Sequence, residues 1–195
     1  MSKPLTPPAL TVLRMLCDGP MHPYEMQQRI RTCHYDEAVK ITPGSLYHTV
    51  DRLAAAGLIE PLETSREGRR PERTVYAVTS AGRDAARNRL ADLFARPAQE
   101  FPALGTALAF ANLLPPAEVA RLLRARTVAL EALLAANQTA YDALRKNGIE
   151  RYKLLDHELT STRLRGELDH VLALADDLES GRMTWTDSDA TRGTE

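Results

Sequence analysis

Four arginines lie within eight residues of the chain and form a group of side chains suited to binding phosphate. A guanidinium group donates parallel hydrogen bonds to phosphate oxygens and fits a narrow minor groove of DNA. Three glutamates in and beside this stretch dilute the positive charge, so a solvated loop without a partner is the alternative interpretation. The candidate DNA-contacting residues here are Arg66, Arg69, Arg70 and Arg73.

A second group of polar side chains surrounds the clearest helix start in the chain. Thr42 is a typical N-cap residue, and proline suits the first helical position that follows it. The apolar spacing of Leu46, Val50 and Leu53 predicts a stripe that faces a core. The remaining faces would then reach DNA, although an ordinary amphipathic helix would show the same pattern. The candidates in this segment are Thr42, Pro43, Gly44, Ser45, Tyr47, His48 and Arg52.

Three of the candidates suit the phosphate backbone in particular. Gly44 allows close approach of the main chain, and the helix N-terminus itself favours an anion. The ring of Tyr47 can pack while its hydroxyl group reaches a phosphate. Tyr24, on the preceding helical segment, is either a further phosphate contact or a plain surface residue.

The elements that must position these residues follow from apolar periodicity and from helix start and stop signals. Two β-rich stretches on either side of the arginine group predict a hairpin, the wing. Three short helices before a hairpin are typical of a winged helix-turn-helix. The expected helices are 8–17, 23–31, 43–56 and 80–94, and the expected strands are 58–62 and 74–79.

The second half of the chain is predicted to be helical throughout, over 101–114, 116–147 and 150–180. A helix over 116–147 would be roughly 48 Å long, more than a compact domain of this size can cover. We therefore expect an antiparallel pair of long helices whose remaining apolar surface binds a second copy, with a purely intramolecular hairpin as the alternative. The candidate dimerisation residues are Leu122, Leu123, Leu130, Leu133, Leu134, Leu168, Val171 and Leu172.

The expected fold is thus mainly α with a small β-hairpin wing. We expect a winged-helix DNA-binding domain over 1–96, a helical dimerisation domain over 97–183 and a disordered tail over 184–195. Charge is uneven between the halves: residues 1–96 hold 14 Lys and Arg against 11 Asp and Glu, whereas residues 97–195 hold 11 against 15. This asymmetry weakly favours a first half that faces DNA.

Composition and motifs exclude several classes of protein. No stretch approaches the roughly 18 apolar residues that span a bilayer, and we do not expect the first residues to act as a signal peptide. Two cysteines without CxxC spacing fit a reducing compartment, so a cytoplasmic location is expected. The motifs GxxxxGK[ST] and HExxH are absent, and we expect neither enzyme activity nor a cofactor.

Two further alternatives remain open at this level. A metal-responsive repressor could use Cys17, His22, Cys33 and His34, because thiolate and imidazole suit zinc, although their spacing is irregular. A winged helix can also serve as a protein–protein interaction module, and the near-neutral net charge of −1 permits this.

Several motifs together resemble one family of regulators. They are residues 24–26 (YEM), 42–47 (TPGSLY), Arg52-Leu53, 57–60 (GLIE) and 69–83 (RRPERTVYAVTSAGR). This combination resembles the PadR family of transcriptional regulators. The resemblance implies a winged-helix homodimer that binds palindromic operator DNA and usually represses.

The same resemblance implies a small aromatic effector, since phenolic acids and planar cationic drugs act on members of the family near the dimer interface. Residues 80–94 contain no tryptophan, so the aromatic sandwich of the multidrug-binding branch is not evident. The only tryptophan, Trp185, falls in the expected polar tail.

Overall fold

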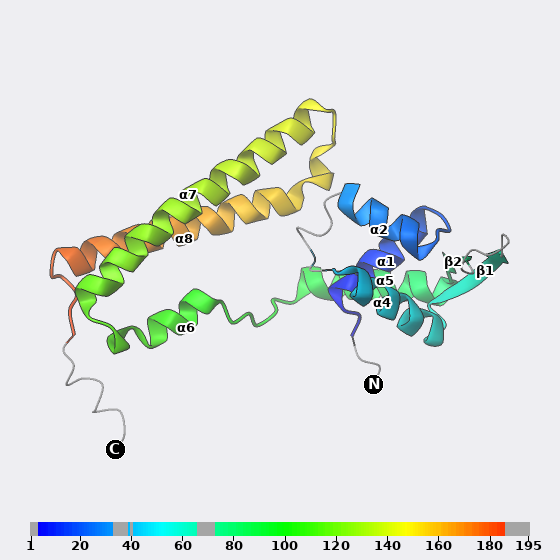
Figure 1. Cartoon of the computed structure of the whole chain (residues 1–195), viewed down its shortest axis with the longest axis horizontal. Coiled ribbons are helices and arrows are strands. Elements are labelled where there is room, and N and C mark those ends of the chain that lie inside the picture. The colour runs from blue at the N-terminus through cyan, green and yellow to red at the C-terminus, as the bar shows by residue number, and fades with distance from the viewer. Residues whose placement is uncertain (1–3, 33–38, 40, 66–72, 186–195) are drawn as a thin grey trace, which may run out of the picture. The chain divides into compact units, whose positions relative to one another are not determined.

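The computed structural model describes residues 4–32, 39, 41–65 and 73–185 (Figure 1). The chain divides into two compact units, Met1–Gln99 and Glu100–Glu195, called unit 1 and unit 2 below. Within the described residues the fold is mainly α-helical, and its one sheet is a two-stranded antiparallel hairpin. The predicted mainly α fold with a β-hairpin wing is therefore confirmed.

The helices of unit 1 begin close to the positions that the sequence predicts. The Thr6 hydroxyl accepts a hydrogen bond from the Ala9 amide at 3.4 Å, and the Thr79 hydroxyl accepts one from the Gly82 amide at 3.0 Å. Each threonine thereby satisfies a backbone N–H group that the first turn of a helix leaves without a partner. The helices are α1 (Pro7–Asp18), α2 (Pro23–Thr32), α4 (Pro43–Ala55) and α5 (Ser80–Ala95).

One apolar core joins these helices to the hairpin. The inward stripe predicted for α4 is confirmed, because Leu46, Val50 and Leu53 are at most 3% exposed. They pack in one cluster with apolar side chains of α1 and α2. Burial of a side chain of this size contributes roughly 1.5–3 kcal/mol, so the stripe holds α4 firmly against unit 1.

The hairpin consists of β1 (Ile59–Ser65) and β2 (Arg73–Val78), and β1 runs three residues beyond its predicted end. Pairing extends from Ile59 opposite Val78 to Ser65 opposite Arg73, with an irregularity after Pro61. Proline lacks the N–H that a strand donates, so a break in register is expected there. The residues between the strands, 66–72, lie outside the described part of the chain.

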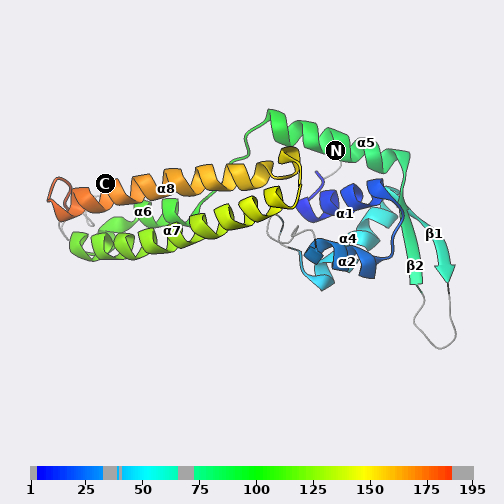
Figure 2. The same cartoon turned by 90° about the horizontal axis from the view of Figure 1, so that it is seen from above.

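Unit 2 is built on two long helices, α7 (Pro116–Lys146) and α8 (Leu155–Glu179), which run antiparallel side by side (Figure 2). The left-handed Gly148, with φ of 80°, ends the first of them. The helix predicted over 101–114 is shorter in the structure, because the chain turns at Phe110 between α6 (Ala103–Ala109) and the 3-10 helix η1 (Ala111–Leu113). A second 3-10 helix, η2 (Arg151–Lys153), precedes α8.

Apolar, ionic and amide contacts fix the register between α7 and α8. Leu123 and Leu130 of α7 pack with Val171 of α8 in the core of unit 2. Arg124 pairs with Asp176 and Glu179, and Arg126 pairs with Glu167. The Asn137 amide donates to the Ser161 hydroxyl at 2.9 Å, which satisfies polar atoms inside the helix pair.

None of the helices in the described part of the chain is long and apolar enough to cross a bilayer.

Candidate nucleic-acid interface

The first turn of α4 is closed by a reciprocal capping box. The Ser45 amide donates to the Thr42 hydroxyl at 3.3 Å, and the Thr42 amide donates to the Ser45 hydroxyl at 2.8 Å. Pro43 occupies the first helical position, where its missing N–H costs nothing. The turn is therefore preorganised, and the Gly44 amide is the N–H group of this turn that is left for an anion, because the Ser45 and Leu46 amides donate to Thr42.

The outward face of α4, with its N-cap residue, carries six of the twelve predicted DNA-contacting residues. Tyr47 is 44% exposed, and His48 and Arg52 are also exposed. Thr42, Pro43 and Gly44 are exposed at the helix start. A Cβ atom added at Gly44 would meet nothing within 4 Å, so the main chain is open to a close neighbour at this point. The structure thus brings these candidates together on one accessible surface of unit 1.

Ser45 differs from its neighbours because its hydroxyl group already has partners. It accepts from the Thr42 amide and donates to the Thr42 carbonyl at 2.9 Å. A hydroxyl group has one hydrogen to donate, so in this arrangement Ser45 can offer DNA only a remaining acceptor site. The side chain is half-buried, and its evident contribution is to hold the turn.

Tyr24 lies in the first turn of α2, whose buried Met26 and Ile30 anchor the helix in the core of unit 1. The ring is 55% exposed, and its hydroxyl accepts a hydrogen bond from the Gln28 side chain at 3.0 Å. The phenolic O–H can still donate to a phosphate. Tyr24 is therefore available for the backbone contact that the sequence suggested.

The wing follows α4 directly, and a small set of contacts sets its base. Gly57 takes a left-handed conformation with φ of 68°, which lets the chain leave the helix. The Thr79 hydroxyl donates to the Gly57 carbonyl at 2.8 Å, and Tyr76 of β2 exchanges backbone hydrogen bonds with Met21. The α4 end, both strands and the start of α5 are thus tied together.

Of the four wing arginines predicted to contact DNA, the structure describes the backbone of one. The backbone of Arg73 opens β2. The other three candidates, Arg66, Arg69 and Arg70, lie outside the described residues. Their contact with DNA stays a prediction.

The predicted dimerisation residues divide into two sets. Leu123, Leu130 and Val171 are at most 5% exposed and pack inside unit 2, so they stabilise the hairpin of one chain. Leu122 and Leu133, at 43% and 57% exposed, remain accessible. The half-buried members are Leu134, Leu168 and Leu172.

The proposed metal ligands do not form a cluster in the described residues. No three His, Cys, Asp or Glu side chains there are arranged to hold a metal ion. Cys17 is exposed, and His22 Nδ1 accepts from the Tyr24 amide at 3.0 Å. Cys33 and His34 lie outside the described residues, so a site that includes them stays a hypothesis.

Sequence reasoning missed the place of Trp185. Its indole N–H donates to the Leu114 carbonyl at 2.9 Å, and the ring packs against the core of unit 2, although the residue falls in the predicted tail. The signal that could have found it is Gly181, a left-handed helix stop, followed by two large apolar residues, Met183 and Trp185.

Comparison with protein families finds a match within unit 1. Residues 12–88 match the model of the transcriptional regulator PadR-like family. The resemblance indicated by the motifs at 42–47 and 69–83 is confirmed. This part of the chain is therefore similar to a family of transcriptional regulators.

Solved structures show the same fold at low sequence identity. Bacillus subtilis PadR in complex with operator DNA has a TM-score of 0.69 and 16% identity, over 87% of this chain and 98% of that one. A PadR-like transcriptional regulator from Bacillus cereus has a TM-score of 0.61 and 15% identity, over 89% and 99%. The Vibrio cholerae virulence activator AphA has a TM-score of 0.55 and 17% identity, over 90% and 95%. Among curated protein sequences, none matched this chain.

Proposed function

We propose that the chain is a transcriptional repressor that binds a palindromic operator as a homodimer, because residues 12–88 match the PadR-like family model. Residues 1–96 would bind DNA, and residues 97–183 would join the two copies. The site of action would be the cytoplasm, where operator DNA lies.

The observation that carries this proposal is the accessible, capped first turn of α4. Its inward stripe is held in the core, while Tyr47 and His48 are exposed on the surface of unit 1. In helix-turn-helix proteins the N-terminal residues of the recognition helix contact base edges in the major groove. The family likeness supports this role, because the Bacillus subtilis PadR of the same fold is in complex with operator DNA.

The DNA contacts fall into two groups under this proposal. His48 and Arg52 would contact base edges, and Ser45 would hold the first turn of α4 in place beneath them. The groups that would hold the sugar–phosphate backbone are Tyr24, Thr42, Pro43, Gly44, Tyr47 and the wing arginines Arg66, Arg69, Arg70 and Arg73. Phosphate contacts fix the register of a protein on the duplex, whereas base contacts supply sequence preference.

Exposed apolar side chains support the homodimer. Leu122 and Leu133 are eleven residues apart on α7 and therefore share one face, because eleven residues make about three helical turns. On α5, Phe94 is 88% exposed. Apolar side chains that gather on one exposed face, as Leu122 and Leu133 do, mark a surface that a partner covers, whereas scattered single ones do not. A two-fold dimer would place two recognition helices on half-sites about 34–36 Å apart or a multiple of that distance.

DNA binding can be tested by measuring how the affinity of the protein for the DNA duplex upstream of its own gene changes with salt concentration. Affinity should fall steeply with salt, with a slope of about −0.9 for each phosphate neutralised. Arg73→Ala should flatten the slope by about 1.8, since a dimer would lose two contacts. Arg165→Ala, which removes an exposed arginine of α8, should leave it unchanged. No binding, or a flat slope for the unmodified protein, would favour a protein-interaction module instead.

Release of the repressor by a small aromatic effector completes the proposal. It is supported by a cavity in unit 2 whose wall includes the only tryptophan of the chain.

A further inference from the structure

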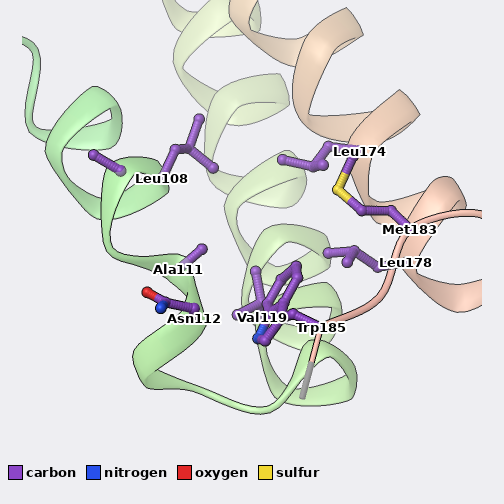
Figure 3. A pocket seen from close by; sticks show the side chains of 9 residues that line it. Leu108, Ala111, Asn112, Val119, Leu174, Leu178, Met183 and Trp185 are labelled. Atoms are coloured by element: carbon purple, nitrogen blue, oxygen red, sulfur yellow. The ribbon is translucent and has the colours of Figure 1, made fainter. Parts of the chain in front are cut away.

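Unit 2 contains a cavity of about 410 Å³ where α6 and η1 lie against the start of α7 and the end of α8 (Figure 3). This volume is within the range of roughly 300–1,000 Å³ that small-molecule sites occupy. The residues that line it are Leu108, Ala109, Ala111, Asn112, Val119, Leu174, Leu178, Met183 and Trp185.

The end of α8 brings two of the large lining residues into place. Gly181 has φ of 74°, a left-handed conformation that ends the helix and reverses the chain. The Met183 amide donates to the Asp177 carbonyl at 3.1 Å, which fixes the return. The Trp185 indole then donates to the Leu114 carbonyl, 71 residues earlier, so the tail is fastened across the cavity to the segment before α7.

The chemistry of the wall is apolar and uncharged. Seven of the nine lining residues are aliphatic or thioether side chains, and the charged residues of unit 2 are not among them. The indole N–H is already used by Leu114. Asn112 is the other polar lining residue, and within the described residues its side-chain amide has no hydrogen-bond partner.

We propose that this cavity binds a neutral, planar aromatic compound that carries one hydrogen-bonding group. Trp185 offers a ring to pack against, and Met183 offers a sulfur atom that favours aromatic edges. Asn112 can donate to or accept from the single polar group. Its role as an effector site rests on the proposed function, whereas occupancy of the cavity depends on unit 2 alone.

The apolar lining of the cavity disfavours a charged ligand. Transfer of an ionised group into an apolar site costs far more than one amide hydrogen bond returns. The cavity should therefore discriminate between two compounds of the same aromatic skeleton that differ only in charge. N-phenyl-1-naphthylamine, which is neutral with one N–H donor, and 1-anilinonaphthalene-8-sulfonate, its sulfonated counterpart, form such a pair.

The experiment uses the full-length protein and the fluorescence of Trp185, which no other tryptophan obscures. The neutral probe should quench this emission saturably, and the sulfonated probe should bind at least tenfold more weakly. Ala109→Phe and, separately, Ala111→Phe fill the cavity and should each weaken the neutral probe at least tenfold. Ala107→Phe, on the opposite side of α6 and outside the lining, should bind like the unmodified protein.

Absence of quenching by the neutral probe would overturn the proposal, and so would equal binding of the two probes. The proposal would also be overturned if Ala107→Phe and both cavity-filling variants bound the neutral probe with equal affinity. Circular dichroism would establish that all three variants are folded. A second copy of the chain that occupied the cavity would also appear as absence of quenching. All of these binding measurements are made without DNA. A negative result would therefore count against the cavity proposal and would leave the proposal of operator binding untouched.

Discussion

The amides and hydroxyl groups of Thr42 and Ser45 bind each other across the first turn of α4, at 2.8 Å in one direction and 3.3 Å in the other. This exchange lies directly beneath the exposed side chains that we propose contact DNA. It fixes the start of the helix before any ligand arrives. Stability of the turn and contact with bases are therefore carried by different residues, which mutation can separate.

Ser45→Ala should lower the stability of unit 1 by about 1 kcal/mol, because it removes half of the capping box. DNA affinity should fall similarly for all sequences as the turn loosens. His48→Ala should leave the melting temperature unchanged and alter which bases are preferred. Thermal unfolding with binding to a panel of single-base operator variants separates the two effects. Identical base preferences in His48→Ala and the unmodified protein would remove His48 from base contact.

Gly82→Ala should destabilise unit 1 by about 3 kcal/mol, at the upper end of what single substitutions cost. An added Cβ would lie 2.0 Å from the Leu58 carbonyl oxygen and 2.9 Å from Val78 Cγ2, so the base of the wing and α5 must separate. Gly44→Ala is the matched control, because a Cβ there meets nothing within 4 Å. Denaturant unfolding measures both variants. Equal stability of the two would show that the close packing at Gly82 is not required.

Leu130→Asp should disrupt the fold of unit 2, whereas Leu133→Asp should disrupt only the dimer. Leu130 is 4% exposed inside unit 2, so aspartate there buries an unpaired charge and should unfold the helix pair. Leu133 is 57% exposed, so its aspartate variant should keep its helical content and halve the mass measured by light scattering. Val128→Asp, at a different side of α7, should remain dimeric. A dimeric Leu133→Asp protein would exclude this face from the interface.

Unit 2 should lose stability in acid because of Glu158. Hydrogen bonds from Arg151, and then from Tyr141, lower the pKa of this carboxyl from 4.5 to about 2. A lowered pKa stabilises the fold above the ordinary value, and this stabilisation is lost as the pH falls from 4.5 to about 2. Glu158→Gln should therefore melt earlier than the unmodified protein at pH 7, with the difference closing near pH 2.

Glu131→Gln, which changes an exposed carboxylate of α7, is the control for that series. Melting temperatures of all three proteins from pH 2 to pH 7 give the comparison. A difference for Glu158→Gln that stays constant across this range would contradict the assignment.

The sequence predicted unit 1 well because its signals are local. Threonine followed by a helix-starting residue marks α4 and α5, and Gly57 marks the end of α4. Such signals act within one helical turn and do not depend on the rest of the fold. The position of the first turn of α4 could therefore be predicted from residues 42–57 alone.

The roles of individual leucines in unit 2 could not be predicted in the same way. Leu130 and Leu133 belong to one apolar pattern on α7, yet only Leu130 packs against α8. The apolar stripe of a long helix can be wider than one neighbouring helix covers. The sequence then does not show which of its leucines face that helix and which face another partner. The contact between Trp185 and Leu114 spans 71 residues and has no local pattern at all. Tertiary packing decides both cases.

Selection of bound duplexes from a random pool tests the central claim that two copies of α4 contact two half-sites of one operator. The account predicts enrichment of an inverted repeat whose half-site centres are separated by about 10–10.5 base pairs or a multiple of that spacing. The pool selected by His48→Ala should differ from it at specific base positions within each half-site. A pool without sequence enrichment, or one that lacks two-fold symmetry, would contradict the account.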